Sequence, residues 1–98
     1  MGHQEKVLVI GRHESMLAKV TALLKEHNYQ ATGRQSNEEA IAAFESDIFD
    51  AVIIGGGVDA ESRHVFYTTF PTINPKVKII DGHPQTILSD LQEAFRKR

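Results

Sequence analysis

The sequence predicts a three-layer α/β/α sandwich around a parallel sheet of about four strands. Two short runs, Val7–Ile10 and Ala51–Ile54, are apolar at every position, which is typical of interior strands whose two faces are both covered by helices. Each run ends at glycine, at Gly11 and at Gly55-Gly56-Gly57, and a helical pattern follows each. Because strands and helices alternate, right-handed crossovers predict parallel pairing.

The first helix is predicted from Glu14 to His27, where apolar residues recur at three-and-four spacing. Asn28 then suits a left-handed helix stop, since asparagine tolerates positive φ better than most residues. Gln30–Arg34 is short and polar and predicts a weak strand. The predicted buried stripe of the helix contains Met16, Leu17, Val20, Leu23, Leu24 and His27.

The second and third helices have recognisable ends. Ser36 is the predicted N-cap of the second, and Glu39 three residues later completes a capping box. The third helix is predicted over Asp59–Phe70, with Pro71 ending it. Their predicted inward residues are Ala40, Ile41 and Phe44, and then Val65, Phe66 and Phe70.

A last strand at Lys76–Ile80 and a last helix at Pro84–Arg96 complete the pattern. The two apolar strands should lie inside the sheet, and the two polar strands should form its edges. Lysine on an edge strand discourages edge-to-edge aggregation, and this strand alternates lysine with apolar residues. The predicted strand order is therefore 2-1-3-4. The apolar stripe of the last helix contains Ile87, Leu88, Leu91, Ala94 and Phe95.

Composition predicts one small cytoplasmic domain over residues 1–98. The chain is 41% apolar and 24% charged, and its formal charge of −2 gives no field that would favour nucleic acid or a membrane surface. It contains no cysteine, which excludes disulfides and thiolate metal sites and is compatible with a reducing compartment. No stretch resembles a signal peptide or a membrane span. We expect no cofactor.

Four stretches are similar, in order and spacing, to one known family: Lys6–Ile10, Leu23–Tyr29, Ser36–Ile41 and Phe49–Ile54. Together they resemble the receiver domain of two-component response regulators, over roughly residues 6–58. The resemblance implies a flavodoxin-like fold and a role in bacterial signal transduction.

The chemistry of that family is missing at the matching positions. Receivers hold magnesium with an acidic pair after the first strand, where this chain has Gly11 and Arg12. The phosphoryl-accepting aspartate is matched by Gly55, and the Thr or Ser after the fourth strand is matched by Asp81. No lysine matches that of the fifth strand. Phosphoryl transfer needs an acceptor oxygen and acids that hold a divalent cation. We therefore expect a pseudo-receiver that is neither phosphorylated nor an enzyme.

The resemblance also implies a missing strand-helix unit. Lys76–Asp81 leads almost directly into Gly82–Leu88, which resembles the start of the family's last helix. The simplest account is loss of the fourth helix and one strand. This loss would turn an interior strand into an edge, which Lys76 and Lys78 suit.

The alternative function is a small anion or nucleotide sensor. Gly55, Gly56 and Gly57 before a helix could form an anion-binding turn, with Arg12 supplying charge. The turn lacks the lysine and Ser/Thr of a phosphate-binding loop, so a plain strand-to-helix turn is the preferred interpretation.

Other site chemistries are weaker. His13, Asp59, Asp81 and His83 should lie along one edge of the sheet, but they lack metal-ligand spacing, and a pair of Arg12 with Asp81 or Asp59 is the preferred interpretation. No nucleophile-base pair is visible. A basic cluster is interpreted as a solvated face and no nucleic-acid partner is expected. It comprises Arg63, His64, Lys76, Lys78 and the tail Arg96–Arg98.

A protein partner is expected at the side that the missing unit would have covered. Phe66 and Tyr67 are adjacent in one helix, so they point to different sides and one of them should be exposed. An exposed aromatic residue beside a bare sheet edge, with Lys76 and Lys78, marks a contact surface. We expect a homodimer through this surface.

Overall fold

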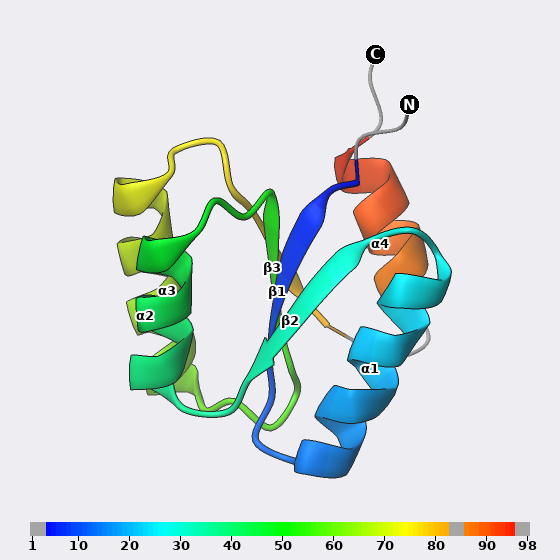
Figure 1. Cartoon of the computed structure of the whole chain (residues 1–98). Coiled ribbons are helices and arrows are strands. Elements are labelled where there is room, and N and C mark those ends of the chain that lie inside the picture. Colours follow the sequence, from blue (N-terminus) through cyan, green and yellow to red (C-terminus); the bar gives the residue numbers. More distant parts are fainter. Residues whose placement is uncertain (1–3, 83–85, 96–98) are drawn as a thin grey trace.

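A computed structural model describes residues 4–82 and 86–95, and a parallel sheet of four strands lies at its centre (Figure 1). The strand order is β2-β1-β3-β4, as predicted. The two apolar strands lie inside the sheet, and the polar strands β2 and β4 form its edges. The strands are β1 (Lys6–Ile10), β2 (Gln30–Arg34), β3 (Ala51–Ile54) and β4 (Lys78–Asp81).

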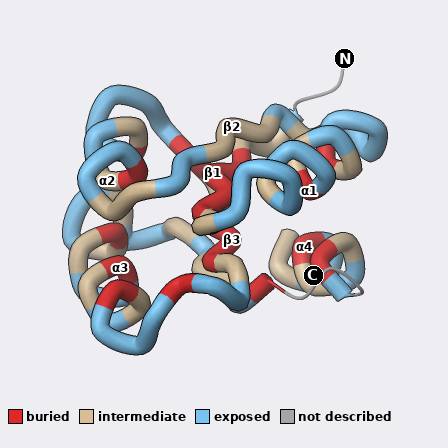
Figure 2. The backbone as a smooth tube through the Cα atoms, turned by 90° about the horizontal axis from the view of Figure 1, so that it is seen from below, coloured by how far each residue is buried: buried red, intermediate tan, exposed pale blue. Residues whose placement is uncertain are grey.

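Helices cover both faces of the sheet, which confirms the three-layer sandwich. α1 and α4 lie on one face, and α2 and α3 lie on the other (Figures 1 and 2). None of the helices in residues 4–82 and 86–95 has the length and apolarity that crossing a membrane requires. The helices are α1 (Glu14–Glu26), α2 (Asn37–Ser46), α3 (Ala60–Ile73) and α4 (Ile87–Ala94).

The two central strands divide the hydrophobic core into two halves. Successive side chains of a strand point to opposite faces, so an all-apolar strand supplies both halves. Leu8 and Ile10 pack with Phe44 and Phe70 beneath α2 and α3, whereas Val7 and Val9 face the other half. That second half also contains Val20, Leu24, Ala51, Ile53, Ile87 and Leu91.

Local signals position the loops as predicted. Asn28 has φ 72° and follows the end of α1. Ser36 is the N-cap of α2, because its side chain accepts a hydrogen bond from Glu39 N at 3.1 Å. Asp50, just before β3, ties the amino ends of two strands together: its carboxylate accepts from Lys6 N at 2.8 Å. These contacts fix the end of α1, the start of α2 and the alignment of the amino ends of β1 and β3.

Two predicted boundaries are wrong. α3 does not end at Pro71 but runs to Ile73. Proline removes only one N–H from the last turn, and that turn is closed by Asn74 N, which donates to Phe70 O at 2.9 Å. β4 begins at Lys78, because Lys76 belongs to a turn in which its N–H donates to Asn74 Oδ1 at 3.1 Å.

The predicted helix ends and stripe need further correction. α4 begins at Ile87, and the predicted start at Pro84 and end at Arg96 lie outside the described residues. His27, which caps the end of α1, is exposed, and Met16 of α1 is 45% exposed, although both were predicted on the buried stripe. Met16 is exposed because no other element covers it: it lines an open pocket between α1 and α4.

Candidate functional site

The candidate site lies at the carboxyl ends of the parallel strands, where the loops after β1, β3 and β4 meet. We call this end of the sheet its carboxyl edge. Three backbone hydrogen bonds continue the ladders beyond the strands and hold these loops together. Gly11 N donates to Arg34 O at 3.1 Å, Gly55 N to Ile10 O at 2.8 Å, and Gly82 N to Ile54 O at 2.8 Å. The fold therefore brings Gly11, Arg12, Gly55 and Asp81 to one edge, as the parallel topology requires.

Arg12 turns toward the amino ends of α2 and α3. Its guanidinium donates to Gln35 O and, at 2.6 Å, to Asn37 Oδ1. Asp59 Oδ1 lies 3.9 Å from Arg12 Nη2. Of the two pairings predicted for Arg12, the structure has the one with Asp59 and lacks the one with Asp81. Even so, the short contacts to Gln35 and Asn37 hold this side chain more firmly than the long ion pair does.

A hydrogen-bond chain extends from Arg12 through the two helix starts. Asn37 Nδ2 donates to Ser62 Oγ at 2.9 Å, and Ser62 Oγ donates to Asp59 Oδ1 at 2.8 Å. Ser62 is buried, and its N–H also donates to Asp59 Oδ2 at 3.1 Å. The hydrogen bonds from Ser62, aided by the nearby charge of Arg12, hold the pKa of Asp59 below its ordinary value. The chain joins the β1–α1 loop to α2 and α3.

Arg63 makes the second ion pair of this edge. Its guanidinium pairs with Asp81, and it also donates to Gly55 O at 2.7 Å and to Val58 O at 3.1 Å. Tyr67 Oη donates to Asp81 Oδ1 at 3.1 Å. Partial burial, followed by this hydrogen bond and the charge of Asp81, raises the pKa of Tyr67. Arg63 therefore fastens the β3–α3 loop to the end of β4.

The sequence interpretation missed this role of Arg63 and the roles of Asn37 and Ser62. Arg63 was grouped with a solvated basic face, yet it is half-buried and bonded to three partners. One signal could have indicated Ser62, which stands three residues after the helix-capping Asp59. No local signal indicates that Arg63 pairs with Asp81, because the two residues are distant in sequence.

The glycine turn has two unused donors. Gly55 N is bonded to Ile10 O, and Gly55 O accepts from Val58 N at 3.2 Å and from Arg63. Within the described residues, the N–H groups of Gly56 and Gly57 have no partner. None of the described glycines has positive φ. The turn therefore offers two donors without the alternating left-handed backbone typical of an anion nest.

The predicted metal and interface residues have different surroundings. His13 is exposed, His83 lies outside the described residues, and no three His, Cys, Asp or Glu side chains gather within the described part as a metal site would require. Phe66 is fully buried, which removes it from the predicted contact surface, whereas Tyr67 is 42% exposed. Lys78 is exposed on β4, while Lys76 lies in the turn before it. The tail Arg96–Arg98 lies outside the described residues.

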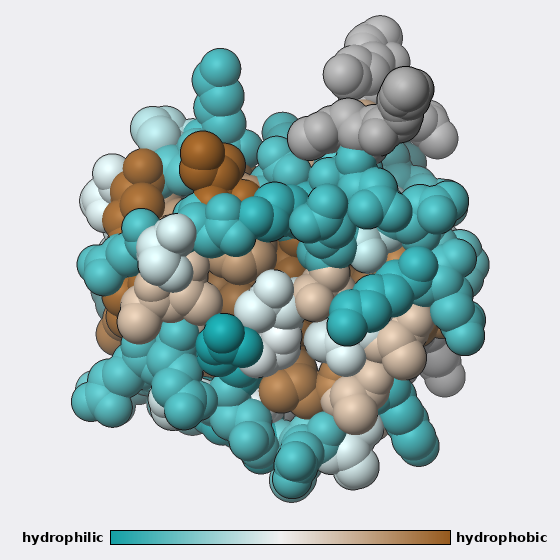
Figure 3. All heavy atoms as spheres, viewed as in Figure 1, coloured by the Kyte–Doolittle hydropathy of each residue, from teal (hydrophilic) through white to brown (hydrophobic). Residues whose placement is uncertain are grey.

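A further exposed apolar pair lies at the opposite end of the sheet, where the strands begin. Ile48 is 75% exposed and Ile73 is 41% exposed, and both line a shallow pocket beside Phe49 at the carboxyl ends of α2 and α3. In Figure 3, apolar surface gathers over this end of the molecule, on a face that is otherwise mostly hydrophilic. The sequence interpretation missed this surface.

Among the comparisons with known proteins, the one with solved structures identifies the fold. No family model and no curated protein matches the sequence. A solved receiver domain (CheY-like) of a response regulator from Methylobacillus flagellatus is 14% identical with a TM-score of 0.70, over 94% of this chain and 99% of that one. The chemotaxis response regulator CheY4 of Vibrio cholerae is 18% identical with a TM-score of 0.66, over 95% and 100% of the two chains. A second structure of CheY4, crystallised at low pH, has a TM-score of 0.63.

The chain is thus an α/β protein of the flavodoxin-like class. Its fold is that of response regulator receiver domains, as the sequence predicted. The described sheet has four strands, and α4 packs on the same face as α1.

Proposed function

We propose that this chain is a non-phosphorylatable, receiver-like protein-interaction module of bacterial signal transduction, acting as one cytoplasmic unit over residues 1–98 and not as an enzyme. One observation carries the proposal. Gly55 stands at the end of β3 where receivers have the phosphoryl-accepting aspartate, and the neighbouring positive charge of Arg12 replaces the acids that would hold magnesium.

The surroundings of Gly55 support this proposal. A Cβ added at this position would lie 3.0 Å from Ile10 O, so an aspartate would need the backbone to shift. Among the described residues at this edge, Asp81 is the one carboxylate directly at a strand end, and it is paired with Arg63 and bonded to Tyr67. A divalent cation needs oxygen ligands that are free to coordinate it. Within the described residues, this edge therefore has no acceptor at the end of β3, and its carboxylates Asp59 and Asp81 are both bonded to neighbouring side chains.

The test of inertness is an amide NMR titration with Mg²⁺ and then with acetyl phosphate or beryllium fluoride. We expect no saturable shift at Gly55, Arg12 or Asp81, while a receiver domain that is readily phosphorylated shows them under the same conditions. A saturable shift centred on Gly55 would overturn the proposal.

A homodimer through the β4 edge is the proposed form of the interaction. Among the described strands, β4 pairs with β3 alone, and its Ile79 and Ile80 are only half-buried although they are the apolar residues of the strand. Tyr67 is 42% exposed beside the end of this strand. Lys78 lies on the same edge. An apolar edge bordered by an aromatic ring is typical of a contact surface, and we propose no nucleic-acid or membrane partner.

Sedimentation velocity tests the dimer. The wild type should sediment as a dimer, Tyr67→Ala should shift it toward monomer, and Tyr67→Phe should stay dimeric, because phenylalanine keeps the ring and loses only the bond to Asp81. A wild type that remains monomeric at high concentration would exclude the homodimer and leave a different protein as partner.

A small anion sensor is the second candidate, favoured by the unpartnered N–H groups of Gly56 and Gly57. Arg12 would have to leave Gln35 and Asn37 to take part. A thermal-shift screen with phosphate, nucleotides and divalent ions distinguishes the two: a concentration-dependent rise in Tm with one anion would favour the sensor.

A further inference from the structure

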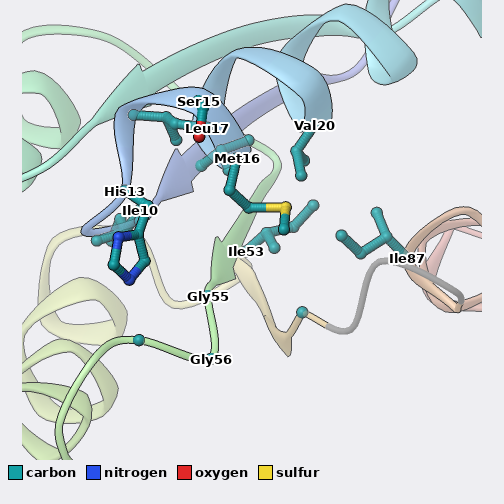
Figure 4. A pocket seen from close by; sticks show the side chains of 14 residues that line it. Ile10, His13, Ser15, Met16, Leu17, Val20, Ile53, Gly55, Gly56 and Ile87 are labelled. Atoms are coloured by element: carbon teal, nitrogen blue, oxygen red, sulfur yellow. The ribbon is translucent and has the colours of Figure 1, made fainter.

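A pocket of about 390 Å³ opens between α1, α4 and the carboxyl ends of β1 and β3 (Figure 4). This volume lies within the range of small-molecule sites. The pocket also lies where the chain crosses from β1 to β2 in one direction and from β2 to β3 in the other, the switch point at which open α/β sheets bind ligands. Its apolar lining is formed by Val9, Met16, Leu17, Val20, Ile53 and Ile87.

The polar groups at the mouth are hydrogen-bond donors. Gly56 and Gly57 line the pocket, and their N–H groups have no partner within the described residues. His13 and Ser15 also line the pocket, and no acidic side chain is among the described lining residues. Such a mouth offers donors to an oxygen acceptor, and its described lining has no carboxylate that would attract a cation.

The packing of the chain itself does not require glycine at position 56 or 57. A Cβ at Gly56 would meet no atom within 4 Å, and one at Gly57 would make only ordinary contacts, at 3.6 Å or more, with Arg12 and His13. Neither has positive φ. In contrast, a Cβ at Gly82 would lie 2.5 Å from Ile53 Cγ2. The open space at Gly56 is thus a feature that neither backbone conformation nor steric crowding explains.

We propose that this pocket binds a small, largely apolar molecule with a carboxylate or similar oxygen acceptor at one end. The apolar body packs between Val20, Ile53 and Ile87, and the oxygen accepts hydrogen bonds from Gly56 N and Gly57 N. Met16, 45% exposed at the mouth, is unbranched and adapts its shape to the occupant. This site does not depend on the proposed interaction module, because it uses neither Arg12 nor the β4 edge, although it shares the donors Gly56 N and Gly57 N with the second candidate function.

The probe for this site is 2-naphthoate, which joins a flat apolar body to a carboxylate, added to the whole chain in an amide NMR titration. We expect saturable shifts at Gly56, Gly57 and Ile53. The amine 2-naphthylmethylamine has a similar body and the opposite charge. We expect its affinity to be at least about tenfold lower, since the donors of the turn cannot bond an ammonium group.

Variants locate the binding. Val20 points into the pocket in Figure 4, so Val20→Phe should fill the space and weaken 2-naphthoate binding by about tenfold or more. Val65→Phe is the matched control, because Val65 is a half-buried valine of α3 on the other face of the sheet. Gly56→Val is a second blocking variant that the fold should tolerate.

Each outcome decides the proposal. Loss of binding in Val20→Phe and Gly56→Val, with binding kept in Val65→Phe, supports it. Absence of saturable shifts in the wild type, shifts that centre away from the pocket, or equal binding of the amine overturns it.

Discussion

The two sides of the carboxyl edge of the sheet differ in how they are filled. On the side of α2 and α3, the side chains of Arg12 and Arg63 are bonded to carbonyls, an amide and carboxylates. On the side of α1 and α4, the same edge opens into an apolar pocket, and two N–H groups of its glycine turn have no partner within the described residues. Both sides share the β1 and β3 strand ends, so the difference arises in the loops and helices.

The comparison teaches that the two sides differ in what their polar groups can still bind. On the arginine side, the polar groups are bonded to one another and have little capacity left for a ligand. On the pocket side, space remains, and the N–H groups of Gly56 and Gly57 have no partner within the described residues. A ligand of this protein is therefore expected on the pocket side, and a rigid loop arrangement on the arginine side.

The largest expected effect distinguishes the two ends of α1. Leu24 is fully buried, whereas Met16 at the pocket is 45% exposed. Leu24→Ala should lower the free energy of unfolding by about 3 kcal/mol, because it leaves a cavity in the core. Met16→Ala should lower it by under about 1 kcal/mol, because little contact is lost. Urea unfolding measures both, and equal losses would mean that the pocket is closed in solution.

The next effect tests the arginine side. Arg63→Met should lower the free energy of unfolding by about 1–2 kcal/mol, because Gly55 O, Val58 O and Asp81 lose their charged donor. Arg34→Met is the control: Arg34 is exposed, and within the described residues its side chain bonds only Gly33 O, so the loss of that side chain should cost within about 0.5 kcal/mol. Equal losses in the two variants would show that the β3–α3 loop does not rely on Arg63.

A smaller effect is expected at the centre of the hydrogen-bond chain. Ser62→Ala removes the hydroxyl that donates to Asp59 and accepts from Asn37, and it should lower the free energy of unfolding by about 1 kcal/mol. Ser46→Ala serves as control, since the exposed Ser46 hydroxyl bonds only Ala43 O and its removal should be near neutral. Chemical denaturation of both variants measures the difference.

The smallest effect is a pH dependence from Asp59. Its pKa is lowered in the folded chain, chiefly by the hydrogen bonds from Ser62, so its contribution to stability is complete above the unfolded pKa. That contribution is lost as the pH falls through the folded pKa. The stability advantage of the wild type over Asp59→Asn, which keeps an N-capping side chain, should therefore be complete above the unfolded pKa of about 3.9 and shrink as the pH falls below it. A constant difference would show that the carboxylate is not stabilised there.

Much of the fold could be predicted because its signals are local or periodic. All-apolar runs indicate strands buried on both faces, and this property alone places β1 and β3 inside and β2 and β4 at the edges. Asn28 and Ser36 indicated helix ends through their own side chains and φ preference. The absence of carboxylates after β1 and β3 is likewise a property of the sequence, since parallel topology assigns those positions to one edge.

The tertiary structure alone decided the contents of that edge. Which arginine meets which aspartate depends on distances between loops of separate elements, so Asp81 pairs with Arg63 rather than with Arg12. Pro71 lies inside α3 because the remaining hydrogen bonds outweigh the one it removes. Met16 is exposed and the pocket exists because α4 leaves the end of α1 uncovered. Sequence periodicity assigns a residue to a face, but only packing between elements determines whether anything covers it.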